Sequence, residues 1–374
     1  MKKLTGVMMF SGPPESTVNI RYLSGFTAPD PFLFMVTPEK KYLVVSTMEK
    51  GRAIKESKPG VEVFSVKDIG ISRSLRGKQS AWALALLKKL ALKQVKVPSD
   101  FPAVVFKELQ NKGIKISILK KSPCPERSVK TKKEIVYLRE SQRAAVAGIR
   151  TAVKLISSAT IDSKRQLRIG RKILTSEMVR RAVHLTLVDY DCIGMDTIIA
   201  GGDQAVDCHN MGYGPLYAGQ AIIMDIFPKS IRHGYWGDIT RTVCRGRAPK
   251  ELKRMYKTVK MAQQAALRMI KPGVDGREIH KTVQEIFEKH GYKTACTNGK
   301  NEGFVHSTGH GVGLNIHEHP SIGILENRLE AGNVITIEPG LYYFGLGGIR
   351  IEDTVVVTEK GWRYLAPCEK IFEI

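Results

Sequence analysis

The chain of 374 residues is long enough for about two domains, and its 43% apolar content is that of an ordinary globular protein. It contains no run near the roughly 20 apolar residues that a membrane-spanning helix requires. The apolar run at its start is too short for the core of a signal peptide. We therefore expect a cytoplasmic protein without a membrane partner.

The cysteines favour the same compartment. They form no Cys-x-x-Cys pair and are scattered along the chain, a distribution typical of free thiols in a reducing environment. A zinc site built on thiolates is therefore not expected. The six positions are Cys124, Cys192, Cys208, Cys244, Cys296 and Cys368.

The net charge of +23 is concentrated in the first third, where residues 1–130 hold 24 basic and 10 acidic side chains. A surface that binds nucleic acid is one explanation. However, the lysines are dispersed and lack interleaved aromatic residues, which favours a solvated charged face. We expect no nucleic-acid partner, and keep a non-catalytic protein that binds nucleic acid as an alternative from a different class.

The first third alternates predicted strands and helices, and we find no catalytic constellation in it. The turn Thr37-Pro38-Glu39-Lys40 predicts a β-hairpin, and the later segments follow strand or helix periodicity. A charged segment with Pro123 and Pro125 reads as a linker. We expect an α/β domain over residues 1–125 and a second domain over residues 126–374. The predicted elements are strands 32–36, 42–46, 61–66 and 114–119 and helices 81–92 and 101–110.

The second domain opens on a clear helix start. Thr131 and Glu134 have the spacing of a capping box, in which each side chain satisfies a free backbone N–H group. Gly291 occupies the position that ends a later helix. Two pairs of apolar runs, each pair with two acidic residues 13 or 14 positions apart, predict two β-hairpins and hint at a duplicated unit. The predicted helices are 131–156, 177–188, 250–269 and 277–290, and the predicted hairpin strands are 221–227 with 235–243 and 333–338 with 349–357.

Four carboxylates interrupt or end these apolar strands. They are Asp225 in Ala-Ile-Ile-Met-Asp-Ile-Phe, Asp238 in Gly-Asp-Ile-Thr-Arg-Thr, Glu338 in Val-Ile-Thr-Ile-Glu and Glu352 in Arg-Ile-Glu-Asp. A carboxylate in a buried strand costs several kcal/mol unless a cation meets it. Arg241 and Arg350 could neutralise two of the four, so a buried salt-bridge network is the alternative to a metal site.

The glycine-rich segment 303–318 favours the metal site. Its histidines are His306, His310 and His317, and glycines at 309, 311 and 313 surround the middle one. Glycines allow the backbone to approach a ligand closely. Carboxylates with imidazole and no thiolate suit manganese, cobalt, zinc or iron. Four carboxylates and one histidine exceed the needs of one ion and match two ions about 3.5–4 Å apart.

At this point the sequence resembles a known family. His-Ser-Thr-Gly-His-Gly-Val-Gly-Leu, Ile-Glu-Pro-Gly-Leu-Tyr and Gly-Gly-Ile-Arg-Ile-Glu-Asp are similar to the motifs of the pita-bread metallopeptidases, in the branch of Xaa-Pro aminopeptidase and prolidase. Residues 19–26 resemble the start of the creatinase-type N-terminal domain. The resemblance implies an α/β (α+β) fold, in which a creatinase-like domain precedes a catalytic domain of duplicated αβ units with an antiparallel sheet.

The resemblance also implies a role for each matched residue. Asp225 would bind one metal, His310 and Glu338 the second, and Asp238 and Glu352 would bridge both. Glu338 would also carry a proton from water to the leaving amine. His317 would stabilise the oxyanion, His306 and His209 would line the pocket, and Tyr342 and Arg350 would lie close to the substrate. The expected cofactor is a pair of divalent ions, manganese first and cobalt, zinc or iron as alternatives.

The sequence departs from the family pattern in two places. Asp225 and Asp238 are 13 residues apart, where 11 is usual, and the extra residues fall in the turn 228–233. An even insertion in a hairpin keeps both acids on one face, so we expect the site to survive. His209 lies in Cys-His-Asn-Met-Gly where Pro-His-Gly is usual, which leaves open a surface or structural histidine.

We therefore expect a metal-dependent aminopeptidase that cleaves between an N-terminal residue and a proline in second position. An Xaa-Pro dipeptidase (prolidase) is the nearest alternative. The resemblance further implies a homodimer that takes peptide substrates.

Overall fold

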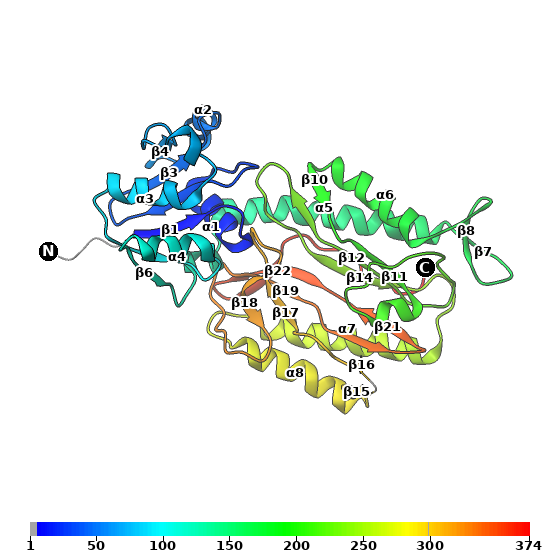
Figure 1. Ribbon diagram of the computed structural model, residues 1–374. Coiled ribbons are helices and arrows are strands. Elements are labelled where there is room, and N and C mark those ends of the chain that lie inside the picture. Colours follow the sequence, from blue (N-terminus) through cyan, green and yellow to red (C-terminus); the bar gives the residue numbers. More distant parts are fainter. Residues whose placement is uncertain (1–5, 298) are drawn as a thin grey trace. The chain divides into compact units, whose positions relative to one another are not determined.

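Alternating apolar residues along the first strands place side chains on both faces of one sheet. The computed structural model describes residues 6–297 and 299–374, and the chain divides into two units, Met1–Arg127 and Ser128–Ile374 (Figure 1). The expected boundary after residue 125 lies two residues before this division. In the described part of the chain, no helix combines the length and apolarity that crossing a bilayer requires.

The first unit is a six-stranded mixed sheet with helices on both faces. The strand order is β4-β3-β2-β1-β5-β6, with antiparallel pairing from β1 through β3 and parallel pairing elsewhere. Met8 and Phe10 point into the core under α3 and α4, whereas Met9 points into the core under α1 and α2. The elements are β1 (Gly6–Phe10), α1 (Pro14–Ser24), β2 (Leu33–Val36), β3 (Lys41–Val45), α2 (Lys50–Glu56), β4 (Val61–Ser65), the 3-10 helix η1 (Arg73–Leu75), α3 (Gln79–Lys89), β5 (Gln94–Val97), α4 (Ala103–Asn111) and β6 (Lys115–Ile118), followed by η2 (Pro125–Ser128).

The first half of the second unit packs two helices on three antiparallel strands. The strand order is β11-β12-β14, and one core joins these strands to α5 and α6. The elements are α5 (Lys132–Ser157), β7 (Thr160–Ile161), β8 (Leu167–Ile169), β9 (Lys172–Ile173), α6 (Ser176–Val188), β10 (Cys192–Gly194), β11 (Ile198–Gly201), η3 (Gly202–Val206), β12 (Ile222–Ile226), β13 (Pro228–Ser230) and β14 (Ile239–Val243).

The second half repeats this plan. Helices α7 and α8 share a core with a sheet of order β18-β17-β19-β22-β23. Figure 1 shows strands β12, β14, β19 and β22 of the two sheets between the α5–α6 pair and the α7–α8 pair. The repetition confirms the expected duplicated catalytic fold. The elements are α7 (Lys250–Met269), α8 (Gly276–Lys289), β15 (Ala295–Thr297), β16 (Lys300–Glu302), β17 (Gly309–Gly311), β18 (Glu318–Ile322), β19 (Val334–Ile337), β20 (Gly340–Tyr343), β21 (Gly347–Arg350), β22 (Asp353–Thr358) and β23 (Gly361–Tyr364).

The predicted helices are confirmed to within a few residues, and the capping box at Thr131 is present with both of its hydrogen bonds. Gly291 has φ +84° after α8, as its role at a helix end requires. The predicted strand 235–243 was too long, because only residues from Ile239 onward join the ladder.

The predicted strand 349–357 is wrong, because it is two strands separated by Ile351 and Glu352. Residues of β21 pair with β20, whereas those of β22 pair with β19. The chain leaves the ladder here because the Glu352 amide donates to the Thr240 carbonyl, 3.0 Å away, beside the other sheet. This break places Glu352 between the two halves.

We predict that Thr131→Ala lowers the free energy of unfolding by about 1 kcal/mol, because the Glu134 amide loses its side-chain acceptor, 3.3 Å away. Thermal unfolding followed by circular dichroism measures the change. Thr282→Ala is the matched control, since its exposed hydroxyl bonds only the Glu278 carbonyl within α8. Equal melting temperatures for the two variants would contradict a stabilising cap.

Candidate metal centre

The strand register brings the two aspartates to one face. Asp225 in β12 lies opposite Thr240 in β14, so the two side chains share a face. Asp238 precedes Thr240 by two residues and therefore falls on that face too. The two additional residues lie in the segment that forms β13 and its turn, which pairs with β10 instead of disturbing the ladder. The even insertion thus leaves both acids facing the same way.

The Asp238 backbone is clamped by helix α5. The Gln142 amide donates to the Asp238 carbonyl and accepts from the Asp238 N–H, both at 2.8 Å. The Thr354 hydroxyl makes a third bond to this backbone by donating to the same carbonyl at 2.6 Å. Gly237 makes this approach possible, since a Cβ there would lie 2.5 Å from the Ser141 carbonyl oxygen. Asp238 is consequently held without using its carboxylate.

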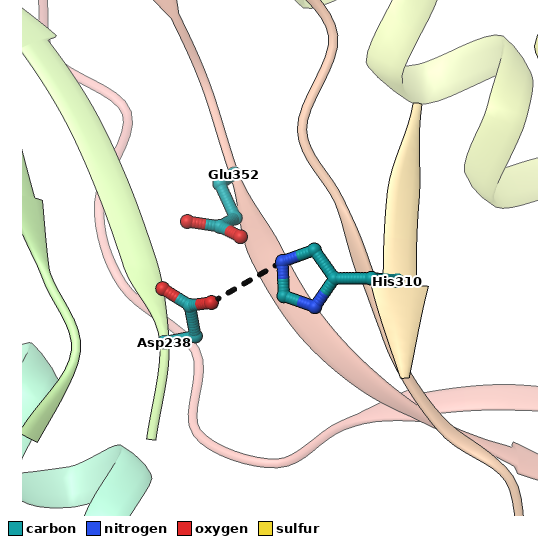
Figure 2. Close-up of side chains that lie close together, drawn as sticks. All are labelled: Asp238, His310 and Glu352. Atoms are coloured by element: carbon teal, nitrogen blue, oxygen red, sulfur yellow. Dashed lines mark ion pairs between the residues drawn. The ribbon is translucent and has the colours of Figure 1, made fainter. Parts of the chain in front are cut away.

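His310 brings an imidazole to these carboxylates from β17. Its Nε2 lies 3.5 Å from Asp238 Oδ2 and 3.2 Å from Glu338 Oε1. One ligand atom each from Asp238, His310 and Glu352 lie within 4.8 Å of one another, as a shared ion requires. Figure 2 shows the His310 ring facing the carboxylates of Asp238 and Glu352.

Threonines on neighbouring strands orient the two glutamates. The Thr240 hydroxyl donates to Glu352 Oε2 at 2.9 Å, across the boundary between the two half-sheets. The Thr336 hydroxyl donates to Glu338 Oε1 at 3.3 Å and accepts from the His310 amide at 3.1 Å. Each carboxylate is therefore fixed in direction while an oxygen face stays open.

Asp225 is hydrogen-bonded to a chain of polar side chains beside these ligands. Arg350 donates to Asp225 Oδ2 at 2.7 Å and to the Tyr342 hydroxyl at 2.8 Å, and that hydroxyl lies 2.8 Å from His306 Nε2. Arg350 thus neutralises one carboxylate, as the salt-bridge alternative expected. Asp225 Oδ1, however, is buried and has no hydrogen-bond partner among the residues that the structure describes.

The remaining histidines lie around this group. The His317 ring stands at 84° to the His310 ring, with centroids 4.2 Å apart. His209 is exposed. Burial lowers the pKa values of His306 and His317, followed by Arg350 for His306 and by His310 for His317, and His209 is near enough to both rings to make a smaller contribution. His306 and His317 therefore lie near the carboxylates, and His209 lies near these two histidines.

The close approach of several ionisable side chains shifts their pKa values. Burial, and then the negative charge of Asp225, raise the pKa of Asp238 well above its usual range; burial and Asp238 do the same for Glu352. Burial opposes charge on His310, but its hydrogen bond to Glu338 and the nearby carboxylates raise its pKa to about 9. Burial would raise the pKa of Glu338, yet His310 lowers it to about 2.

These observations fit a site for divalent cations. Asp225 Oδ1 is a buried acceptor without a donor, and the raised pKa values show carboxylates that lack enough positive charge. Oxygen ligands with a single imidazole suit hard or borderline divalent ions. Asp225, Asp238, His310, Glu338 and Glu352 could together hold them.

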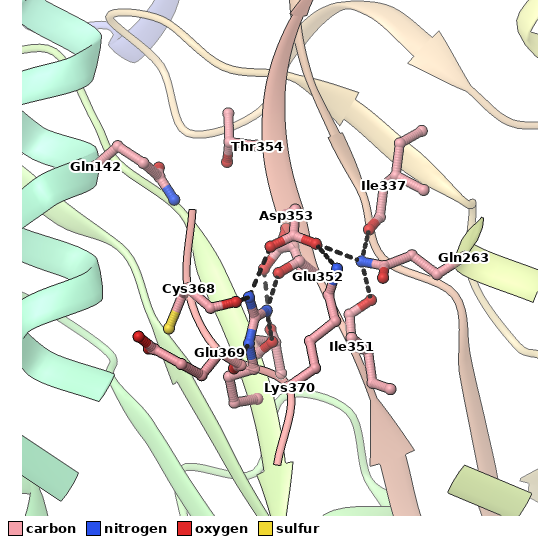
Figure 3. Close-up of polar contacts among 12 residues, drawn as sticks. Gln142, Gln263, Ile337, Ile351, Glu352, Asp353, Thr354, Cys368, Glu369 and Lys370 are labelled. Atoms are coloured by element: carbon pink, nitrogen blue, oxygen red, sulfur yellow. Dashed lines mark hydrogen bonds and ion pairs between the residues drawn. The ribbon is translucent and has the colours of Figure 1, made fainter. Parts of the chain in front are cut away.

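A second buried network lies behind Glu352, and the sequence did not reveal it. Arg241 pairs with Asp353 at 2.7 Å and also donates to the Glu352 carbonyl. Figure 3 shows Gln263 and Lys370 converging on the Asp353 carboxylate. Under the salt-bridge alternative, Arg241 could have neutralised one of the four site carboxylates, but it pairs with Asp353. Neither the Gln142 contacts with Asp238 nor the contacts of Arg241 and Gln263 with Asp353 have a short-range signal, because these partners are about 90 or more residues apart.

The fold and the site define a metal-dependent enzyme built from two similar halves. A family model described as Metallopeptidase family M24 matches residues 137–359, and one described as Creatinase/Prolidase N-terminal domain matches residues 2–120. The chain belongs to metallopeptidase family M24 and is a metallopeptidase, which confirms the resemblance read from its motifs.

Individual proteins add detail. The Xaa-Pro dipeptidase of Pyrococcus furiosus is 30% identical over 357 residues, covering 94% of this chain and 92% of the relative. The prolidase structure from Pyrococcus horikoshii OT3 superimposes with a TM-score of 0.81 at 27% identity, covering 98% of this chain and 95% of that one. The X-Pro aminopeptidase structure from Thermotoga maritima MSB8 also has a TM-score of 0.81 but only 23% identity, covering 99% and 98%, and supports the fold alone.

We predict that metal binding releases protons and weakens as the pH falls. His310, with a pKa of about 9, carries a proton at pH 7 that a cation must displace. Below pH 9 the affinity should rise about tenfold per pH unit for each proton released. Titration calorimetry with Mn²⁺ at pH 6, 7 and 8, in buffers of different ionisation enthalpy, measures the affinity and the number of protons released. Equal Mn²⁺ affinity at pH 6 and 8 would contradict this prediction. The control is His290→Ala, at the exposed end of α8, which should leave the pH dependence of Mn²⁺ binding unchanged.

Proposed function

We propose that this metallopeptidase is an Xaa-Pro dipeptidase. The grouping of Asp238, His310 and Glu352 carries the proposal, in a chain that aligns along nearly its whole length with a relative named Xaa-Pro dipeptidase. The expected Xaa-Pro aminopeptidase is less well supported, because the neighbour of that name shares only the fold. Both activities cleave before proline, so they differ in the length of substrate that the pocket accepts.

Two divalent ions, manganese first among the candidates, are the proposed cofactor. Asp225 would hold one ion, His310 and Glu338 the other, and Asp238 and Glu352 would lie between them. Bound there, such ions supply a Lewis acid that acidifies water and polarises a carbonyl group. The unpartnered Asp225 Oδ1 and the mutually repelling carboxylates support this assignment.

The side chains around the ions divide the remaining work. Glu338 is the proposed proton carrier, because its carboxylate lies within the group, 3.2 Å from His310 Nε2, and would take a proton from water and return it to the leaving proline nitrogen. His317, beside His310, is placed to donate to the carbonyl oxygen as negative charge develops there. The exposed His209 would lie at the rim of the pocket.

Tyr342 and Arg350 were expected to contact substrate, but their contacts favour another role. Arg350 uses its three nitrogens on Asp225, the Tyr342 hydroxyl and the Thr240 hydroxyl. His306 likewise bonds Tyr342 through Nε2 and the Ser307 carbonyl through Nδ1. We assign Arg350 and Tyr342 to the positioning of Asp225, and His306 to a wall of the pocket.

The Mn²⁺-loaded protein should hydrolyse Gly-Pro and should cleave an Arg-Pro-Pro tripeptide at least about tenfold less efficiently, since a dipeptide pocket closes behind the proline. Release of free amino acids, followed by chromatography, gives kcat/KM for each peptide. Gly-Ala is the substrate control. Faster cleavage of Arg-Pro-Pro than of Gly-Pro would favour the Xaa-Pro aminopeptidase activity instead.

Glu338→Gln should lower kcat about 10²- to 10⁴-fold, because the amide cannot accept the proton. Glu330→Gln, exposed and away from the site, should leave kcat unchanged. No cleavage of any proline peptide, with binding to DNA retained at about 0.2 M salt, would favour the alternative nucleic-acid-binding protein.

We also propose that the protein forms a homodimer through an acidic and apolar face of its second unit. Besides Asp225 of the metal site, residues 182–228 contain five aspartates and no lysine or arginine, although Arg180 and Arg181 lie beside Leu185 and Val188 and Arg232 pairs with Asp191. Residues 1–130 carry an excess of 14 positive charges. Residues 182–228 also expose large apolar side chains, so a second copy can supply both the complementary charge and apolar contact. The exposed residues are Leu185, Val188, Tyr190, Ile193, Met195, Met211 and Tyr213.

Analytical ultracentrifugation should find a dimer. The double variant Asp189→Lys/Asp196→Lys should raise the dissociation constant of this dimer at least about tenfold, because both exposed side chains then carry the same charge as the basic partner surface and repel it. Glu330→Lys/Glu359→Lys makes the same change of charge at other exposed positions and should leave the dimer intact. A monomer at micromolar concentration, or equal weakening by both pairs, would contradict the proposal.

A further inference from the structure

One residue from the first half of unit 2 holds the loop that carries His317 in the second half. The Trp236 backbone N–H donates to the Gly313 carbonyl at 2.9 Å, and its indole Nε1–H donates to the Leu314 carbonyl at 3.0 Å. Two successive carbonyls of the loop after His310 are thus bound by a single residue. His317 follows Leu314 by three positions.

The loop is itself tightly built. The Gly313 amide bonds the Asn315 carbonyl at 3.0 Å, and a Cβ on Gly313 would collide with the Glu318 carboxylate. Glu318 forms a buried ion pair with Lys130 at 2.7 Å, with 9% and 1% of the side chains exposed. These contacts tie Gly313, Asn315 and Glu318 together and connect the segment to Lys130.

Trp236 is fixed relative to the metal ligands. It precedes Asp238 by two residues, and between them Gly237 presses against the Ser141 backbone of α5. Lys229 pairs with Trp236 across the strand, and its Nζ lies 5.3 Å from the indole centroid. The two donors of Trp236 thus keep a constant position with respect to Asp238.

We propose that Trp236 is a positioning residue for His317, setting the place of its ring beside His310. The inference rests on the proposed function, in which His317 donates to the carbonyl oxygen of the scissile bond. Because the His310 and His317 rings are in contact at 4.2 Å, a small shift of the loop changes where that donor points. The indole N–H acts through the loop and touches no reacting atom.

Trp236→Phe tests this, because it removes the indole donor and keeps an aromatic ring. It should lower kcat on Gly-Pro about three- to tenfold, the effect of one hydrogen bond, with KM and Mn²⁺ affinity within about twofold of wild type. In a His317→Ala background the same change should have no further effect, because Trp236 acts only through His317. An equal loss of kcat in that background, or a loss that follows Mn²⁺ affinity, would overturn the proposal.

Backbone hydrogen exchange of the Mn²⁺-loaded protein separates this inference from the proposed activity. Trp236→Phe should accelerate exchange of amides within 312–318 and leave α5 and β14 unchanged. Trp362→Phe, in β23 against Tyr364, is the matched control and should change neither kcat nor this exchange. Unaltered exchange in 312–318 would exclude a positioning role. Failure of every variant to cleave Gly-Pro would instead refute the proposed function.

Discussion

The mutual repulsion of buried carboxylates is the constraint on which the site depends. Asp225, Asp238, Glu338 and Glu352 approach one another, and burial followed by their mutual repulsion raises the pKa values of Asp238 and Glu352. Within the described residues, Arg350 and His310 form ion pairs with these acids. Two positive charges against four negative ones leave a deficit, which divalent ions are suited to fill.

The fold supplies the energy that holds these acids together. Each half of the catalytic unit packs its helices on an antiparallel sheet, and the two apolar cores are the main source of stability. Between them, Thr240 bonds Glu352 through both its carbonyl and its hydroxyl. The buried Arg241–Asp353 pair stands directly behind this contact and stiffens it. Repulsion at the site is thus opposed by packing and hydrogen bonds that do not involve the ligand oxygens.

The proposed site draws its residues from both halves of the catalytic unit. The side chains that would act on substrate, Glu338 and His317, lie on or after strands of the second half, whereas Asp225 and Asp238 belong to the first half. Contacts that cross between the halves therefore set catalytic geometry. The Trp236 contact with Gly313 and Leu314 is one, and the Arg350 contact with Asp225 is another. Both are polar and directional, which suits them to fix distances where apolar packing alone would tolerate drift.

The sequence by itself predicted the α-helices of the second unit, its strands β12, β14 and β19, and the acids and histidines proposed for the site. Helix periodicity, the Thr131 cap and the acids inside apolar runs are local properties, readable from neighbours in the chain. The alternation of strand side chains even foretold that a two-residue insertion would keep Asp225 and Asp238 on one face. Only the tertiary structure decided where the strand 349–357 breaks, which arginine meets which acid, and that Gln142 and Trp236 brace the site. These depend on contacts between residues about 80 to 110 positions apart, and no local pattern encodes which distant partners the packing of two half-sheets brings together.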